Sequence, residues 1–281
     1  MTETKAAPAA PEQGPRNLLM RFIAALVLAP AAIAIAYAGG WLWSALATLA
    51  AIGLYVEWLM IVGAVHETRV VASGGVALAI AGFCFAAGRI DASLVALVAG
   101  FAVVAWLAPE RRHWAVLGFL YAAAAEIASV LVRLDQGQGY TALTFVLLIV
   151  WVTDIAGYFV GRGMGGPKLW PRVSPKKTWA GALGGFAASL GVSAGFAGMG
   201  LGRTLPILLV GAALSIASQL GDLFESAVKR RFGVKDSSQL IPGHGGLMDR
   251  LDGFVAAIVL AAILGLLRTG ADSAGRGLMV W

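Results

Sequence analysis

The chain contains 281 residues, of which 59% are hydrophobic and only 13% are charged, and its mean hydropathy is +0.82. A typical soluble domain is about 25% charged and could not bury this much apolar surface, so the composition excludes a water-soluble globule. The single cysteine, Cys84, excludes an internal disulfide and a metal site built from several cysteines. We therefore expect an all-α, polytopic integral membrane protein.

Apolar windows of spanning length recur along the whole chain. Crossing the hydrocarbon core takes about 20 residues of helix, and lipid-exposed backbone must satisfy its own hydrogen bonds, so each window is predicted to be helical. These windows, about nine in number, are 21–38, 41–63, 72–88, 92–108, 114–132, 141–161, 179–200, 205–228 and 251–268.

The basic residues indicate an orientation. The net charge is +6, but basic residues in a membrane protein chiefly record topology and contacts with anionic headgroups, so we do not expect nucleic acid as a partner. With a cytosolic amino terminus, only five of the 21 lysines and arginines fall outside: Arg89, Arg133, Arg203, Arg268 and Arg276. This bias predicts that the amino terminus is cytosolic and the carboxyl terminus external.

Two of the predicted inside segments, 161–178 and 229–252, combine cations with glycines and hydroxyl side chains. Glycine-rich turns let backbone amides approach phosphate oxygens, and nearby lysines neutralise the charge. Taken alone, such segments fit phosphate binding and ordinary positive-inside anchoring equally well.

Carboxylates within the predicted spans favour the first interpretation. An ionised group in hydrocarbon costs at least roughly 2.5–3.5 kcal/mol, so each should face a polar cavity, a metal or a cation. Asp154, Asp222 and Asp249 are all expected near the level of the two basic segments. One helix face should carry four polar side chains at positions i, i+3, i+4 and i+7, namely Asp222, Glu225, Ser226 and Lys229.

Two further glutamates need not belong to a site. Glu57 lies near the cytosolic end of the second span, where it either reaches the interface or contributes to a site. Glu126 lies too deep in the fifth span to join the other carboxylates, so we expect it to form a hydrogen bond between helices.

The segment from Ser226 to Asp252 closely resembles the signature of bacterial phosphatidate cytidylyltransferases, also called CDP-diacylglycerol synthases. The matching elements are Ser226, Lys229-Arg230, Lys235-Asp236, Pro242-Gly243-His244-Gly245-Gly246 and Asp249-Arg250-Leu251-Asp252. Asp154, Gly161 and the run from Ser174 to Thr178 also look like this family. One departure is Ala180, where relatives often carry Gln or Glu, which argues against a side-chain role at that position.

The resemblance implies transfer of the cytidylyl group of CTP to phosphatidate, giving CDP-diacylglycerol and pyrophosphate, with Mg²⁺ as cofactor. Joining two polyanions requires charge neutralisation rather than a catalytic base. We expect Asp222 and Asp249 to bind Mg²⁺, with Asp154 either a weaker third ligand or a partner that contacts the ligands, and Lys229 and Arg250 to complete the catalytic set. The expected substrate-binding residues are Ser174, Lys176, Lys177, Thr178, Arg230, Lys235, Asp236, His244, Gly245 and Gly246.

On this interpretation the chain divides into a disordered cytosolic tail over 1–20, N-terminal transmembrane helices over 21–133 and a C-terminal catalytic region over 134–281. The expected location is the bacterial inner (cytoplasmic) membrane, with the site facing the cytosol. The sequence leaves open whether the chain forms a homodimer.

Two other functions fit some of these features. A CTP-dependent polyprenol kinase would also use CTP at a membrane, but its alcohol nucleophile would require a base. A transporter would also carry carboxylates within its spans, although near the midplane and between repeats. The signature separates the cytidylyltransferase from both; composition and topology alone do not exclude a transporter.

Overall fold

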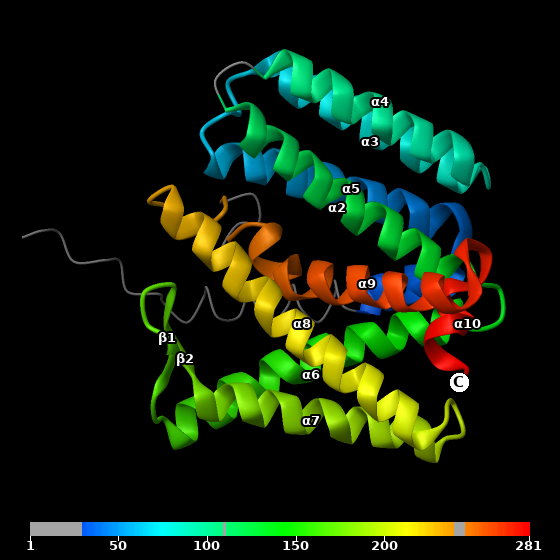
Figure 1. Cartoon of the computed structure of the whole chain (residues 1–281), viewed down its shortest axis with the longest axis vertical. Helices are drawn as coiled ribbons and strands as arrows, with labels where there is room; N and C mark the ends of the chain where they lie inside the picture. Colours follow the sequence, from blue (N-terminus) through cyan, green and yellow to red (C-terminus); the bar gives the residue numbers. More distant parts are fainter. Residues whose placement is uncertain (1–29, 109–110, 239–244) are drawn as a thin grey trace, which may run out of the picture.

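The computed structural model describes residues 30–108, 111–238 and 245–281, and it is a helical bundle with one short hairpin (Figure 1). Eight helices in this part of the chain are long and apolar enough to cross a membrane. They are α2 (Gly40–Ile61), α3 (Thr68–Ala86), α4 (Ile90–Leu107), α5 (Arg112–Leu134), α6 (Gly139–Met164), α7 (Trp179–Gly198), α8 (Thr204–Arg231) and α9 (Met248–Thr269). The polytopic helical class is confirmed. Of the first predicted span, 21–38, the described residues 30–38 are helical.

The helices are stacked in layers. The outermost pair is α3 and α4, which lies against α2 and α5 (Figure 1). Helix α9 packs against α5 on one side and α8 on the other, and α6 and α7 complete the opposite face (Figure 1). In the α2–α5 core, the fully buried Trp58 and Tyr55 satisfy their polar atoms by donating hydrogen bonds to the carbonyls of Trp114 and Val70.

A two-stranded antiparallel hairpin joins α6 to α7, where the sequence suggested only a loop. Strand β1 (Lys168–Trp170) pairs with β2 (Ser174–Thr178), with Lys168 opposite Thr178. Gly165 and Gly166 adopt positive φ angles at the end of α6, which lets the chain turn sharply into β1. The hairpin lies at the same end of the bundle as the last turn of α8 and the start of α9 (Figure 1). We call this the hairpin end.

The opposite end of the bundle is tied together by polar side chains. Arg133 donates hydrogen bonds to the carbonyls of Ala36 and Tyr37, near the end of the helical stretch that precedes α2. Asp135 accepts hydrogen bonds from the amides of Gly137 and Gln138, just before α6, and from the amide of Arg276 in the short helix α10 (Ala274–Met279). The loops and the terminal segment at this end are thereby fixed to one another.

Glu126 forms the interhelical hydrogen bond that its depth suggested. Its Oε1 accepts from the hydroxyl of Thr48 on α2 at 2.7 Å, and both side chains are buried. The prediction that Glu126 stands apart from the other carboxylates is confirmed.

Glycines allow the backbones of α6 and α7 to touch. A Cβ placed on Gly181 would lie 2.7 Å from the carbonyl oxygen of Gly157, and one on Gly185 would lie 2.5 Å from that of Thr153. Small residues at i and i+4 permit such close approach in membranes. This contact fixes the relative position of α6 and α7.

We predict that Gly185→Ala lowers thermal stability, because the new methyl group meets backbone that cannot rotate away; overpacking of this kind costs roughly 1–3 kcal/mol. The matched control is Gly191→Ala on the same helix, where nothing lies within 4 Å of the added Cβ. Thermal unfolding of both proteins in detergent would test this. Equal melting temperatures for the two variants would contradict the packing described here.

Candidate active site

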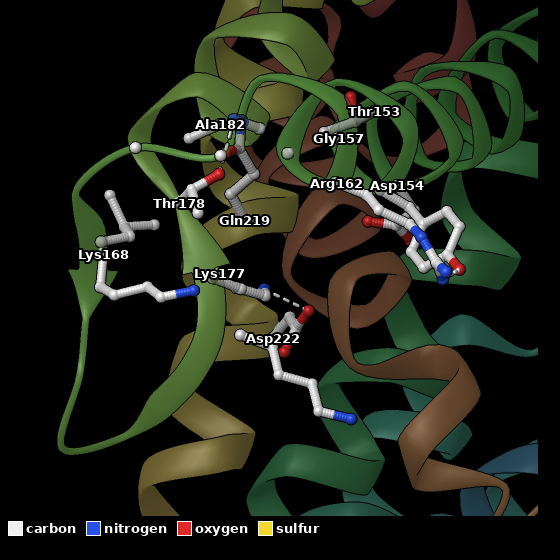
Figure 2. A pocket seen from close by; sticks show the side chains of 17 residues that line it. Thr153, Asp154, Gly157, Arg162, Lys168, Lys177, Thr178, Ala182, Gln219 and Asp222 are labelled. Carbon is white, nitrogen blue, oxygen red and sulfur yellow. Dashed lines mark hydrogen bonds and ion pairs between the residues drawn. The ribbon is translucent and has the colours of Figure 1, made fainter.

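A cavity of about 790 Å³ lies between α6, the hairpin, α7 and α8 (Figure 2). Helix α6 contributes one wall, β2 and the first turn of α7 a second, and α8 a third. Five residues expected at the site line this cavity: Asp154, Lys176, Lys177, Thr178 and Asp222. The fold therefore brings together residues from three separate parts of the sequence.

Opposite charges lie next to each other in the cavity lining. Lys177 on β2 forms an ion pair with Asp222 on α8, and both side chains remain partly exposed, at 29% and 28% (Figure 2). Asp154 lines the same cavity from α6, on the wall that also carries Arg162 (Figure 2). The cavity thus offers both carboxylate oxygens for a metal and ammonium groups for an anion.

Asp249 belongs to a neighbouring, more enclosed cluster. Lys229 is only 8% exposed, and its Nζ lies 3.0 Å from Glu225 Oε2 and 2.5 Å from Asp249 Oδ1. The other oxygen of Asp249 accepts hydrogen bonds from the amides of Ser237 and Gly246 and lies 3.0 Å from the Ser237 hydroxyl. The amine of Lys229 is therefore held by two carboxylates rather than directed into the cavity.

The cavity and the Asp249 cluster adjoin where α8 crosses α9. A Cβ on Gly221 would lie 2.6 Å from the carbonyl oxygen of Asp252, so the two helices are in close contact beside Asp222. Within the described ranges, no set of three or more His, Cys, Asp or Glu side chains is gathered as a metal cage. Asp154 and Asp222 share the cavity, whereas Asp249 lies one helical turn before this crossing.

The remaining predicted residues take varied places. Arg230, Lys235, Asp236 and Arg250 are exposed at the hairpin end, while Ser174 is half-buried at the start of β2. Gly246 is buried and Gly245 is half-buried before α9.

His244 lies outside the described residues. Thr178 lines the cavity, but its Oγ1 also accepts a hydrogen bond from the Gly181 amide and so caps α7.

Several lining residues were not identified from the sequence as site residues. They are Thr153, Tyr158, Arg162, Lys168 and Gln219. Helical spacing was the available signal, because Tyr158 and Arg162 follow Asp154 at intervals of four, and Gln219 precedes Asp222 by three. The Arg162 guanidinium donates to the Tyr158 hydroxyl at 2.9 Å, which orders both side chains on this wall.

Glu57 does not reach the interface. It is 1% exposed, and its carboxylate contacts the chain just before and at the start of α9. Of the two alternatives that the sequence leaves open for Glu57, the one in which its side chain reaches the interface does not hold, because hydrogen-bond donors from residues 237–238 and 247–248 enclose it inside the bundle.

Comparison with known proteins identifies the family of the chain. The profile of the cytidylyltransferase family matches residues 19–267. The phosphatidate cytidylyltransferase of Brucella suis biovar 1 is 40% identical over 258 residues, covering 89% of this chain and 93% of that protein. The Staphylococcus haemolyticus enzyme of the same name is 46% identical over 132 residues, covering 46% of this chain and 50% of its own. Both the profile and the near full-length relative establish that the chain belongs to the cytidylyltransferase family.

Proposed function

We propose that the cavity is where a cytidylyl group passes from CTP to phosphatidate, giving CDP-diacylglycerol and pyrophosphate. The observation that carries this proposal is that two carboxylates, Asp154 and Asp222, and two lysines, Lys176 and Lys177, line one cavity in a chain of this family. Carboxylates and lysines on facing walls suit a nucleotide triphosphate that arrives with a divalent metal.

The donor set fits Mg²⁺. This ion is usually held by one or two carboxylates together with substrate phosphates and waters, rather than by a cage made entirely of protein. Asp222 and Asp154 would provide the carboxylates in the cavity. Asp249, which the sequence suggested as a ligand, does not line the cavity: its Oδ1 contacts Lys229 and its Oδ2 is held by backbone amides. Bound in the cavity, Mg²⁺ would neutralise phosphate charge and favour departure of pyrophosphate.

The reaction needs little acid or base chemistry from the protein. An ionised phosphate oxygen of phosphatidate attacks the α-phosphorus of CTP, a new P–O bond forms, and the bond to the bridging oxygen breaks as pyrophosphate leaves. The nucleophile carries no proton that must be removed. The chain's task is to align two polyanions and offset their repulsion, for which we assign Lys176 and Lys177 from β2 and Arg162 from α6.

The position of the cavity suits a lipid substrate. Helix α6, which forms one wall, exposes the large apolar side chains Ile155 and Phe159 on its outer surface. In a membrane these side chains would contact acyl chains. A phosphatidate headgroup could therefore reach the cavity from the lipid side while its acyl chains stay in the bilayer.

We predict that Asp222→Asn reduces turnover roughly a hundredfold or more, because the amide keeps the size but loses the charge that Mg²⁺ requires. Formation of lipid-linked cytidine from labelled CTP, phosphatidate and Mg²⁺ is the measurement. Glu126→Gln, a buried carboxylate distant from the cavity, is the control and should retain most activity. Near-normal Mg²⁺-dependent turnover of Asp222→Asn would place the metal elsewhere.

We predict that Lys177→Gln raises the KM for CTP about tenfold, because the cavity loses one of its phosphate-neutralising charges; loss of a charged hydrogen bond costs roughly 1.5–3 kcal/mol. Arg172→Gln, in the turn of the same hairpin and outside the cavity lining, should leave the KM within twofold. Steady-state kinetics with varied CTP would separate them. An unchanged KM in Lys177→Gln would remove this lysine from the binding site.

For the orientation, we propose that the hairpin end faces the cytosol. A cysteine at Arg172, introduced after Cys84→Ser, should react with a membrane-impermeant reagent only when cells are opened. A cysteine at Met199, in the connection between α7 and α8 at the opposite end, should react from outside intact cells. The reverse pattern would invert the proposed topology.

A further inference from the structure

Glu57, on α2, is surrounded by hydrogen-bond donors from a segment that begins 180 residues later in the chain. Its Oε1 lies 2.6 Å from the Ser238 hydroxyl and 2.8 Å from the Leu247 amide. Its Oε2 lies 2.9 Å from the Ser237 hydroxyl and 2.7 Å from the Met248 amide. A single carboxylate thus binds the chain at 237–238 and again at 247–248.

Two of these donors belong to the start of α9. The first amides of a helix have no partner within the helix, and the helix dipole favours a negative charge beside them. No side chain within α9 or at its N-cap accepts the Leu247 or Met248 amide; the acceptor comes from α2. Glu57 therefore caps α9 from a distant helix and fixes where this helix begins.

Fixing the start of α9 also fixes Asp249. The Ser237 hydroxyl lies between the two carboxylates, 2.9 Å from Glu57 Oε2 and 3.0 Å from Asp249 Oδ2, and its one proton can be given to either. Asp249 in turn contacts Lys229 through its other oxygen. A continuous set of polar contacts leads from Glu57 through Ser237 to Asp249 and Lys229.

The packing around Glu57 leaves little room for another arrangement. A Cβ on Gly246 would lie 1.8 Å from the Ser237 hydroxyl and 2.6 Å from Glu57 Oε2. One turn earlier on α2, a Cβ on Gly53 would lie 2.6 Å from a methyl group of Leu247. Because neither glycine has a side chain, the segment just before α9 packs directly against α2.

From these contacts we infer that Glu57 is a positioning residue for the cytidylyl transfer, acting through Ser237 and the start of α9 to hold Asp249 and Lys229 beside the cavity. The inference rests on the proposed function. It assigns a role in the chemistry to the N-terminal helices, which contribute no side chain to the cavity lining within the described ranges.

The test is a double-mutant cycle on turnover. Glu57→Gln keeps the shape but offers an amide N–H to donors that need an acceptor, so kcat should fall at least tenfold. The KM for CTP, which we assign to the cavity, should stay within threefold. Because the two residues act in one set of contacts, adding Ser237→Ala to Glu57→Gln should lower kcat much less than the product of the single effects. Glu126→Gln is the matched buried-carboxylate control, and its effect should multiply with that of Ser237→Ala.

The outcomes separate the two proposals. Suppose that the wild-type protein makes product. A normal kcat in Glu57→Gln, or effects of Glu57→Gln and Ser237→Ala on kcat that simply multiply, would then overturn the positioning role and leave the proposed function standing. No product from folded wild-type protein would overturn both. If Glu57→Gln does not fold, Glu57→Asp, which keeps the charge but withdraws it by one methylene, replaces it with the same expected non-additivity.

A second measurement does not depend on activity. Hydrogen exchange in a peptide covering residues 246–252 should be at least tenfold faster in Glu57→Gln than in wild type, because the side chain keeps only one acceptor oxygen for two amides and loses the negative charge that stabilises the start of α9. The same peptide in Glu126→Gln should exchange at the wild-type rate. Unaltered protection in Glu57→Gln would overturn the capping contact on which the inference depends.

Discussion

Carboxylates within helices of membrane-spanning length impose the main constraint on this protein, because each must be matched by a cation or by several hydrogen-bond donors. At the hairpin end, Asp222 is paired with Lys177, and Glu225 and Asp249 share Lys229. Glu57 is instead satisfied by two hydroxyls and two backbone amides. These requirements bring α2, α8, α9 and the hairpin to one end of the bundle.

Local sequence patterns predicted most of the fold and some of the residues that line the cavity. The mean hydropathy of a window of about 20 residues reflects many side chains at once, so it located the ends of α4, α5 and α7 to within a few residues. The start of α9 was less well placed, at 251 instead of Met248, because the polar residues of its first turn interrupt the apolar pattern. The signature identified the family, and charge in apolar windows marked Asp154 and Asp222, both of which line the cavity.

Other features depend on contacts between distant segments and had no local signal. The hairpin forms because Lys168 pairs with Thr178 across the two strands. The glycines, prolines and lysines of this segment do not by themselves indicate a strand. The separation of Asp249 and Lys229 from the cavity follows from how α8 crosses α9. Glu57 lies 190 residues from Leu247, and its sequence neighbours give no indication of the donors that enclose it.

The glycine contact between α6 and α7 has a thermodynamic consequence for ligand binding. Where backbone touches backbone, there is no side chain to change rotamer, so the walls that these helices form around Gly157, Gly161 and Gly181 are preorganised. Binding at such a wall loses little conformational entropy. The conformational entropy that is lost on binding is instead that of the long side chains of Lys176, Lys177 and Arg162. Each of these side chains is restricted from several rotamers to one when it binds phosphate.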